Sequence, residues 1–471
     1  MTTLTNIVGD ILTASNTATV TNKTINRANN TLTVRMANDV SGTLPVANGG
    51  SGQTSGFSEG EILIGNTTGN TLTKATLTGG NDICVTNGNG TITIAYCVPI
   101  VYNNSLWTWG HASDGALGDN TTVSKSSPVS VVGGFTDWCQ VSGGTNSLAL
   151  GVRTNGTAWA WGDGGSGQLG DNAAVDKSSP VSVVGGFTNW SKVSSGSSHA
   201  VGLRQDGTMW AWGYNGAGQL GTNSTTNTSS PVSVVGGFTD WCQIAGGHKN
   251  SFGIRTNGVL YAWGYNNSGR LGINNTETKS SPVSVVGGFT DWCGVANKNH
   301  TIAVRTNGTA WAWGCGYHGQ LGNSIFGTYA NPNLRSSPVS VVGGFTNWCQ
   351  VTGGFRISLG VRTDGTLYSW GINPAGVLGH NTASNASTNS PVVVVGGFTD
   401  WCQVSNTYSS MAVAVRTNGT IWSWGCNGNG RLGNNNTTNS SSPVSVVGGF
   451  TDWCQVSATY AGAVGIRSTV T

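Results

Sequence analysis

Short segments that alternate apolar and polar residues recur along most of the chain, and none of them has a helical period. In residues 153–161, Arg-Thr-Asn-Gly-Thr-Ala-Trp-Ala-Trp, an Asn-Gly pair separates two alternating runs. Asn-Gly between alternating hydrophobic residues is a strong signal for a tight β-hairpin. Trp159 and Trp161 are two positions apart, so they lie on one face of the predicted strand. The β-branched run Pro-Val-Ser-Val-Val predicts a further strand.

These segments belong to a unit that recurs at a period of about 51 residues. Each unit also contains an aromatic-x-Trp-Gly string and, farther on, a Leu-Gly pair. The string Ser-Pro-Val-Ser-Val-Val-Gly-Gly-Phe-Thr-(Asp/Asn)-Trp, or a near copy, begins at Ser127, Ser179, Ser230, Ser281, Ser337, Ser390 and Ser442.

Seven units of short strands predict an all-β fold, with a seven-bladed β-propeller over residues 101–471. The first unit starts near Leu106 without an Arg-Thr-Asn-Gly hairpin before it, and the last stops near Arg467 without a Trp-x-Trp strand after it. We expect the first and last strands to pair and complete one blade, because closure leaves no open sheet edge. An open solenoid would instead need polar capping repeats.

The hairpin motif, the Trp-Gly to Leu-Gly spacing and the unit length resemble the regulator of chromosome condensation repeat family. The resemblance covers residues 106–467, and it implies a seven-bladed propeller. It also suggests functions known in that family, which are nucleotide exchange on a small GTPase and inhibition of a β-lactamase. Both are performed by binding a protein across one face of the propeller.

Residues 1–100 differ, because they contain no Trp and are rich in Thr, Asn and Gly. Alternating segments predict short strands, with an Asn87-Gly turn between Ile83–Thr86 and Thr91–Ile94. Residues 41–60 form a Gly/Ser-rich joint. A region this poor in apolar residues cannot easily build its own core, so we expect it to gain stability by oligomerising along a fibre.

Four strings in this region resemble segments of bacteriophage tail fibres. They are Thr21–Ile25, Leu44–Ser55, Ile62–Thr73 and Val85–Ile94. The resemblance implies a small β-rich attachment and shaft region, a homotrimer, and contacts through residues 1–100 with other virion tail proteins. It therefore places the protein in the virion.

Composition and charge exclude several partners. Only 8% of residues are charged and the net charge is +3, with the basic residues scattered singly. No basic patch for nucleic acid is present, and no apolar stretch is long enough to enter a membrane. The first residues lack the cationic and apolar regions of a signal peptide. We therefore expect assembly in the host cytoplasm and release by lysis.

No pattern of catalytic or metal-binding residues is evident. The sequence has no phosphate-binding loop and no His-Glu-x-x-His motif, and its six His are spread over different units. We therefore predict no enzymatic activity, no metal and no cofactor.

Two residue types recur with the repeat. A Cys follows the repeated Trp at Cys139, Cys242, Cys293, Cys349, Cys402 and Cys454, with Ser191 in its place in one unit. We interpret these as small buried thiols rather than a metal ring. A Cys84–Cys97 disulfide is left open. Each unit also has an Arg in its hairpin, which we interpret as an anchor for the Asp or Asn before Trp rather than as an anion site.

Positions that vary among the repeats are not constrained by the fold, and they therefore mark a candidate binding surface. Three variable sets stand out: the long insertion 323–335, the loop between the repeated Trp and Arg, and the residues after Trp-Gly. The candidate receptor-binding residues are Phe326, Tyr329, His248, Lys249, Lys298, His300, Phe355, Arg356, Tyr408, Tyr460, Tyr214, Tyr265, Tyr317 and His318. Exposed aromatic residues in a polar frame suit sugar or protein contacts.

The sequence thus predicts a phage tail-fibre protein whose propeller binds a host receptor non-covalently. The expected receptor is a surface polysaccharide or an outer-membrane protein. The alternative is a purely structural virion protein whose propeller packs against other virion proteins. A bacterial adhesin is a further possibility, but it would need a secretion signal.

Overall fold

The computed structural model describes residues 102–328, 332–382, 386–406, 411–460 and 462–470, and the backbone of five strands before residue 102. The chain divides into two compact units, Met1–Val101 with Thr471, and Tyr102–Val470. None of the helices in these described parts has the length and apolar character needed to span a bilayer.

In the first unit, β4 (Ile83–Gly88) and β5 (Thr91–Tyr96) form the hairpin predicted around Asn87-Gly. β1 (Leu32–Arg35) pairs with β5, and β2 (Glu61–Gly65) pairs with β3 (Leu72–Thr76). The joint at 41–60, a Cys84–Cys97 bond and the fibre shaft lie outside the described residues.

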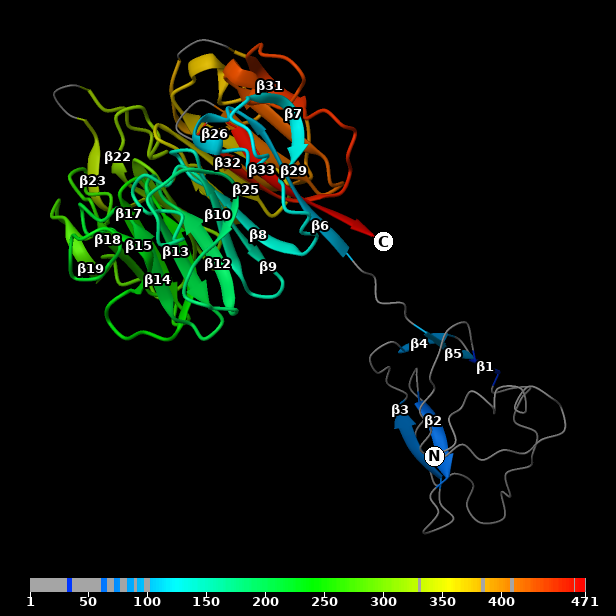
Figure 1. Ribbon diagram of the computed structural model, residues 1–471. Helices are drawn as coiled ribbons and strands as arrows, with labels where there is room; N and C mark the ends of the chain where they lie inside the picture. The colour runs from blue at the N-terminus through cyan, green and yellow to red at the C-terminus, as the bar shows by residue number, and fades with distance from the viewer. Residues whose placement is uncertain are drawn as a thin grey trace. The chain divides into compact units, whose positions relative to one another are not determined.

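The second unit is a seven-bladed β-propeller, in which each blade is a four-stranded antiparallel sheet (Figure 1). This confirms the predicted fold class. The strands of blades 1 to 3 are as follows, from the axis outward. Blade 1 has β8 (Trp138–Gly143), β9 (Leu148–Arg153), β10 (Ala158–Gly162) and β11 (Lys177–Ser182). Blade 2 has β12 (Trp190–Ser195), β13 (His199–Arg204), β14 (Met209–Gly213) and β15 (Thr228–Ser233). Blade 3 has β16 (Trp241–Gly246), β17 (Asn250–Arg255), β18 (Leu260–Gly264) and β19 (Lys279–Ser284).

The remaining blades repeat the same order. Blade 4 has β20 (Trp292–Asn297), β21 (His300–Arg305), β22 (Ala310–Cys315) and β23 (Leu334–Ser340). Blade 5 has β24 (Trp348–Gly353), β25 (Ile357–Arg362), β26 (Leu367–Gly371) and β27 (Thr388–Val393). Blade 6 has β28 (Trp401–Asn406), β29 (Met411–Arg416), β30 (Ile421–Gly425) and β31 (Ser440–Ser445). The closing blade has β32 (Trp453–Thr459), β33 (Gly462–Val470), β6 (Tyr102–Gly110) and β7 (Lys125–Ser130). Short 3-10 helices occupy Ser113–Gly115 (η3), Pro374–Gly376 (η4) and Gly428–Gly430 (η5).

The two ends of the propeller close it into a ring, as predicted. β33 pairs with β6 in an unbroken antiparallel register from Gly462↔Gly110 to Val470↔Tyr102. In Figure 1 the red C-terminal strands lie beside the blue and cyan strands β6 and β7. Residues from opposite ends of the sequence therefore share one sheet, and the ring has no unpaired edge at this seam.

Tryptophan rings join neighbouring blades. The second Trp of each Trp-x-Trp string is fully buried, as in Trp212 and Trp313. The Trp212 indole donates a hydrogen bond to the Gln168 carbonyl of the preceding blade at 2.9 Å, and Trp313 donates to the Arg270 carbonyl at 3.0 Å. The repeated Leu-Gly glycine makes room for this ring, because a Cβ on Gly170, whose φ is +70°, would lie 2.7 Å from the Trp212 nitrogen.

The seven repeated Arg side chains are anchors, as predicted. Each donates from Nε to the Asp or Asn that precedes the repeated Trp; Arg305 to Asp291 measures 2.7 Å and Arg204 to Asn189 also 2.7 Å. Arg305 also stacks on a Phe ring, with its Cζ 4.1 Å from the centroid of Phe289. These cations are neutralised or stacked within their own blades and are not free for a ligand.

The prediction of buried thiols is wrong for the Cys that follows the repeated Trp. Cys139, Cys293, Cys349, Cys402 and Cys454 are exposed and Cys242 is partly buried. A register shift between the Trp and the residue after Cys, such as Trp348 to Gln350, makes the Cys a bulge residue rather than a core residue. Each thiol donates to a carbonyl of the second strand, and Ser191 makes the same bond to the Leu203 carbonyl at 3.0 Å. This shared bond explains why Ser can replace Cys.

Candidate functional site

The antiparallel order of the strands sorts the loops of every blade onto two faces. The loop from the inner to the second strand and the loop from the third to the outer strand open at one end of the blade. We call this end the loop face. The Arg-Thr-Asn-Gly hairpins and the connections from outer to inner strands open at the opposite end, the hairpin face.

The described residues of all three variable sets lie on the loop face. Its described residues are 144–147, 196–198, 247–249, 298–299, 354–356 and 460, with 111–124, 163–176, 214–227, 265–278, 316–328, 332–333, 372–382, 386–387 and 426–439. The long insertion is therefore on the same face as the short loops near the axis. The hairpin face, in contrast, carries the segments that hardly change from blade to blade.

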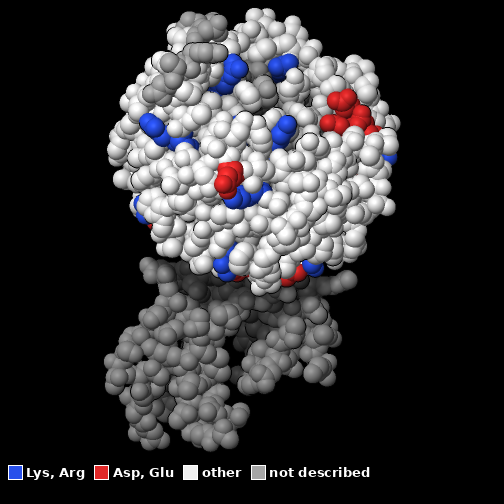
Figure 2. All heavy atoms as spheres, turned by 90° about the vertical axis from the view of Figure 1, so that its left-hand side faces the viewer, with Lys and Arg blue, Asp and Glu red and all other residues white. Residues whose placement is uncertain are grey.

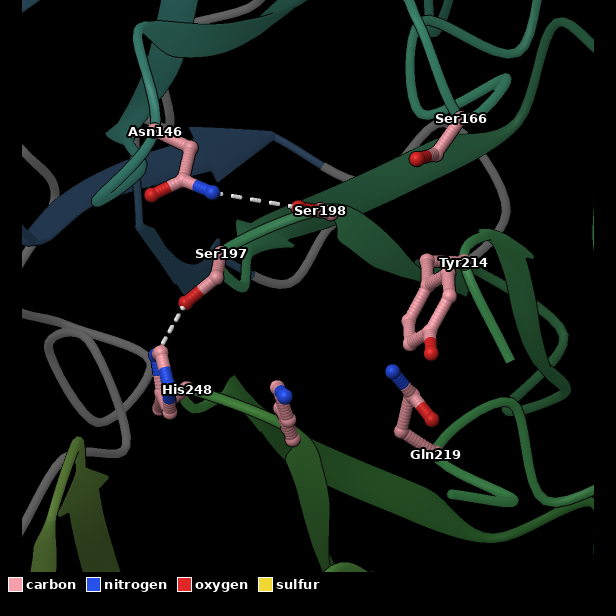
Figure 3. Close-up of a pocket in the computed structure, with 8 residues that line it drawn as sticks. Asn146, Ser166, Ser197, Ser198, Tyr214, Gln219 and His248 are labelled. Atoms are coloured by element: carbon pink, nitrogen blue, oxygen red, sulfur yellow. Dashed lines mark hydrogen bonds between the residues drawn. The ribbon is translucent and has the colours of Figure 1, made fainter. Parts of the chain in front are cut away.

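An open pocket of about 240 Å³ lies on the loop face between blades 1, 2 and 3 (Figure 3). Tyr214 forms one wall, and His248 and Lys249 form another. The polar side chains that complete the lining are Asn146, Ser166, Ser197, Ser198 and Gln219. The pocket thus combines one aromatic ring, one cation and several uncharged hydrogen-bonding groups.

Contacts between successive inner loops position the pocket's His248. Thr145 and Ser197 hydroxyls are 2.7 Å apart, and Ser197 Oγ is 2.7 Å from His248 Nδ1. The His248 ring then meets the Phe355 ring of blade 5 edge to face, with centroids 6.2 Å apart. Burial, and the nearby cations Arg270, Lys249 and Lys298, lower the pKa of His248 to about 4, so the ring is neutral at pH 7.

The remaining candidates divide by their surroundings. Lys249 is exposed, with Nζ 6.0 Å from the centroid of the Tyr265 ring. The Tyr317 and His318 rings are 4.9 Å apart, and Arg356 Cζ lies 5.6 Å from the Phe355 centroid. Phe326 and Tyr460 are 45% and 43% exposed. Tyr329 and Tyr408 lie outside the described residues.

His300 does not belong to the surface. It is fully buried, and its Nε2 lies 2.6 Å from the Ser358 hydroxyl of blade 5. That hydroxyl donates its own proton to the Gln320 carbonyl, so His300 must donate to it from Nε2. Burial, and then Arg270, lower the pKa of His300 to about 3. His300 is therefore a neutral core residue, and we remove it from the candidate set.

Charges are unevenly distributed over the loop face. Lys249, Arg270, Lys298 and Arg356 lie on blades 3 to 5 and form no ion pair within the described residues. Asp114, Asp163 and Asp176 lie on the closing blade and blade 1, where burial and the other two acids raise the pKa of Asp163. Elsewhere charge is sparse: in the view of Figure 2 uncharged side chains cover most of the propeller surface, with Lys and Arg in separate spots and Asp and Glu in a few small groups.

Sequence reasoning missed most of the polar residues that line the pocket. Ser166, Ser197, Ser198 and Gln219 have small or common side chains, and only their meeting at the junction of blades makes them a lining. Only the strand order identifies these residues. It brings the loop after the inner strand and the loop after the third strand onto the same face of the propeller.

The chain matches models of the regulator of chromosome condensation (RCC1) repeat. The matches cover residues 103–150, 155–203, 206–254, 257–297 and 418–461 with one model, and 190–219 and 295–320 with a second. Together they span more than half of the chain.

Relatives and solved structures agree with this match. The ultraviolet-B receptor UVR8 of Arabidopsis thaliana is 27% identical over 356 residues, which are 72% of this chain and 77% of that protein. The human E3 ubiquitin-protein ligase HERC2 is 30% identical over 66% of this chain, but the match spans only 6% of that ligase.

Two solved structures show the same fold. Yeast RCC1 (Prp20), in a crystal structure with Kap60, has a TM-score of 0.69 at 18% identity and covers 79% of this chain and 90% of its own. Human WBSCR16 has a TM-score of 0.67 at 18% identity and covers 78% of this chain and 99% of its own. With its matching repeats and its closed ring of blades, the chain belongs to the regulator of chromosome condensation (RCC1) repeat family.

Proposed function

We propose that this protein is a bacteriophage tail-fibre component whose loop face binds a receptor on the host cell surface without changing it chemically. One observation carries the binding role. The variable loops of all described blades share one face, where aromatic and basic side chains surround an open pocket. Variation confined to one face of a repeated fold is expected where that face meets a partner.

The pocket favours a sugar as part of that receptor. Its volume of about 240 Å³ is below the roughly 300–1,000 Å³ of sites for drug-sized ligands, and suits about one sugar ring. The Tyr214 ring offers a flat apolar surface, while Asn146, Ser198 and Gln219 offer hydrogen bonds to hydroxyl groups. Few contacts make single-site binding weak, so several copies on one fibre would be needed for firm attachment.

The fibre assignment rests on the resemblance of residues 20–96 to phage fibre segments. In this proposal residues 1–100 form the trimeric shaft and attach to other tail proteins. The propeller is the distal, receptor-binding part. We propose binding rather than catalysis, because the imidazole of the pocket, that of His248, is held neutral and is hydrogen-bonded to Ser197.

A structural role in the virion is the second candidate. A similar propeller, yeast RCC1 (Prp20), is found in a crystal with the protein Kap60. A relative of the same fold that is bound to another protein favours a protein partner here as well, and in this proposal a neighbouring virion protein would cover the loop face.

Binding to bacterial cells distinguishes the receptor-binding role from the structural role. Fluorescently labelled full-length protein, shown to be trimeric by analytical ultracentrifugation, is titrated against a panel of bacterial strains. We expect saturable binding to some strains only, lost after periodate oxidation of cell-surface sugars and kept after protease treatment. Loss after protease treatment alone would instead indicate a protein receptor. A trimer that binds no strain would contradict the receptor role and favour the structural one.

A further inference from the structure

A polar cavity of about 180 Å³ lies on the axis of the propeller, close to the loop face. All seven inner strands contribute to its lining near their C-terminal ends, from Ser142 of β8 to Ala458 of β32. The only charged residue among the lining residues is Lys298. No Asp or Glu is among these residues, so the cavity has one cation and no fixed counter-charge.

The loop of blade 4 explains why a lysine is there. In blades 2, 3 and 5 the inner loop has three residues and begins with glycine, whereas in blade 4 it has two and begins with Lys298. The Lys298 amide donates to the His300 carbonyl, as the Gly247 amide donates to the Asn250 carbonyl in blade 3. Lys298 thus occupies the position of a glycine at the axis, and only its side chain is added.

Lys298 has no carboxylate partner among the described residues. Lys125, Lys177 and Lys279, on outer strands, each pair with an acid. Burial lowers the pKa of Lys298 to about 8, which leaves the ammonium mostly protonated at pH 7. A partly buried cation without a partner is costly unless an anion or water satisfies it.

Other lining groups also have hydrogen-bond donors to spare. The hydroxyls of Ser194, Ser405 and Ser457 each accept a backbone N–H from a neighbouring blade, so each keeps its own O–H to donate. Asn406 is 3% exposed, and its buried Nδ2 has no partner, while its Oδ1 accepts from Thr352. One lining acceptor, Asn297 Oδ1, is also unpartnered.

We propose that this axial cavity is an anion-binding site that takes a carboxylate or phosphate group. The Lys298 ammonium, the Asn406 amide and the serine hydroxyls would donate to its oxygens. Charge-assisted hydrogen bonds of this kind are the strong ones in proteins. The site does not depend on the tail-fibre role, and it accepts a free anion or an acidic group carried on a glycan.

The test uses thermal unfolding of the full-length protein in phosphate, acetate and glucuronate, at constant ionic strength balanced with chloride. Ligands that bind only the folded state raise Tm in a saturable way. We expect such a rise in wild type and a loss of at least about tenfold in apparent affinity in Lys298→Gln. Asn406→Asp should also abolish the rise in Tm on adding an anion, because the new carboxylate would act as an internal partner for Lys298. The carboxylate can still accept the hydrogen bond from Thr352 that Asn406 accepts.

Two controls keep the result interpretable. Lys279→Thr removes a cation from the outer strand of blade 3, away from both pockets, and introduces the residue that blade 2 carries there, Thr228; its anion response should equal that of wild type. Far-UV circular dichroism without added anion checks that each variant folds. Stronger stabilisation by an acidic oligosaccharide than by glucuronate would indicate that the acidic group is part of a larger ligand. An unchanged Tm in wild type, or an undiminished response in Lys298→Gln, would overturn the proposal.

Discussion

At the scale of single residues, the repeat gives the same side chain different roles according to where its neighbours lie. The Arg anchors were predictable because an Arg and an Asp or Asn recur together in every unit. The position of the Cys was not, because the bulge after the repeated Trp is a matter of strand register and leaves no mark in residue type. His248, in the inner loop of blade 3, lines a pocket, whereas His300, at the start of β21, is in the core.

The buried His199 and His300 predict a specific loss of stability in acid. Burial lowers the pKa of each to about 3, against about 6.5 in an unfolded chain. Protons therefore bind the unfolded state more tightly, so the stabilisation is complete above about pH 6.5 and declines as the pH falls toward 3. We expect Tm to fall steadily over this range.

A matched variant tests this assignment. His199→Leu with His300→Ile places residues that blades 1 and 5 carry at the same positions, Leu148 and Ile357. Thermal unfolding between pH 7 and 4 should show a flatter dependence in this double variant. An equal slope in wild type and variant would mean that other groups cause the acid sensitivity.

At the scale of elements, hairpins and blade boundaries could be predicted because Asn-Gly turns, Trp-x-Trp strands and β-branched strands recur in a fixed order. Contacts between blades could not. The inner-strand Gln is one example: Gln140 Oε1 accepts the Val193 amide of the next blade at 2.8 Å, and its Nε2 donates to the Val193 carbonyl at 3.0 Å. Such pairs join strands more than 50 residues apart, so no local pattern reveals them.

Blade 4 lacks this contact, because Gly294 stands where Gln140 stands in blade 1. A cavity of about 200 Å³ lies beside Gly294 and Val351, and a Cβ on Gly294 would meet no atom within 4 Å. We expect Gly294→Gln to bond to Val351 and raise the free energy of unfolding by about 1 kcal/mol. Urea unfolding measures this, with Gly294→Ser as a smaller side chain that cannot reach; no gain over Gly294→Ser would contradict the account.

At the scale of the whole molecule, closure of the ring is the feature that comparison of the first and last repeats predicted best. The missing parts of the first and last units are complementary, and β33 and β6 pair accordingly. The assignment of loops to faces needed the structure, because it depends on which strand lies innermost. Sequence reasoning could therefore name Tyr214, His248 and Lys249 of the pocket, but not most of the polar side chains that complete its lining.

The closing strand β33 should contribute more to the stability of the propeller than its length suggests. Deleting residues 462–471 removes β33 and opens the ring, so we expect Tm to fall by more than about 10 °C. Removing only 468–471 leaves the register from Gly462 to Arg467 intact and should have a smaller effect. Equal melting of both deletions and wild type would show that closure contributes little.

The most direct test of the central claim compares the two faces. The loop-face variant Tyr214→Asp with Lys249→Ser uses residues that other blades carry at the same positions, Asp163 and Ser198. The hairpin-face variant Asn155→Asp with Asn257→Asp does the same, following Asp206 and Asp364. The quantity measured is the dissociation constant of each labelled protein for a bacterial strain that wild type binds.

The account predicts that the loop-face variant binds at least about tenfold more weakly, while the hairpin-face variant stays within about twofold of wild type. Wild-type affinity in the loop-face variant, or a comparable loss in the hairpin-face variant, would contradict it.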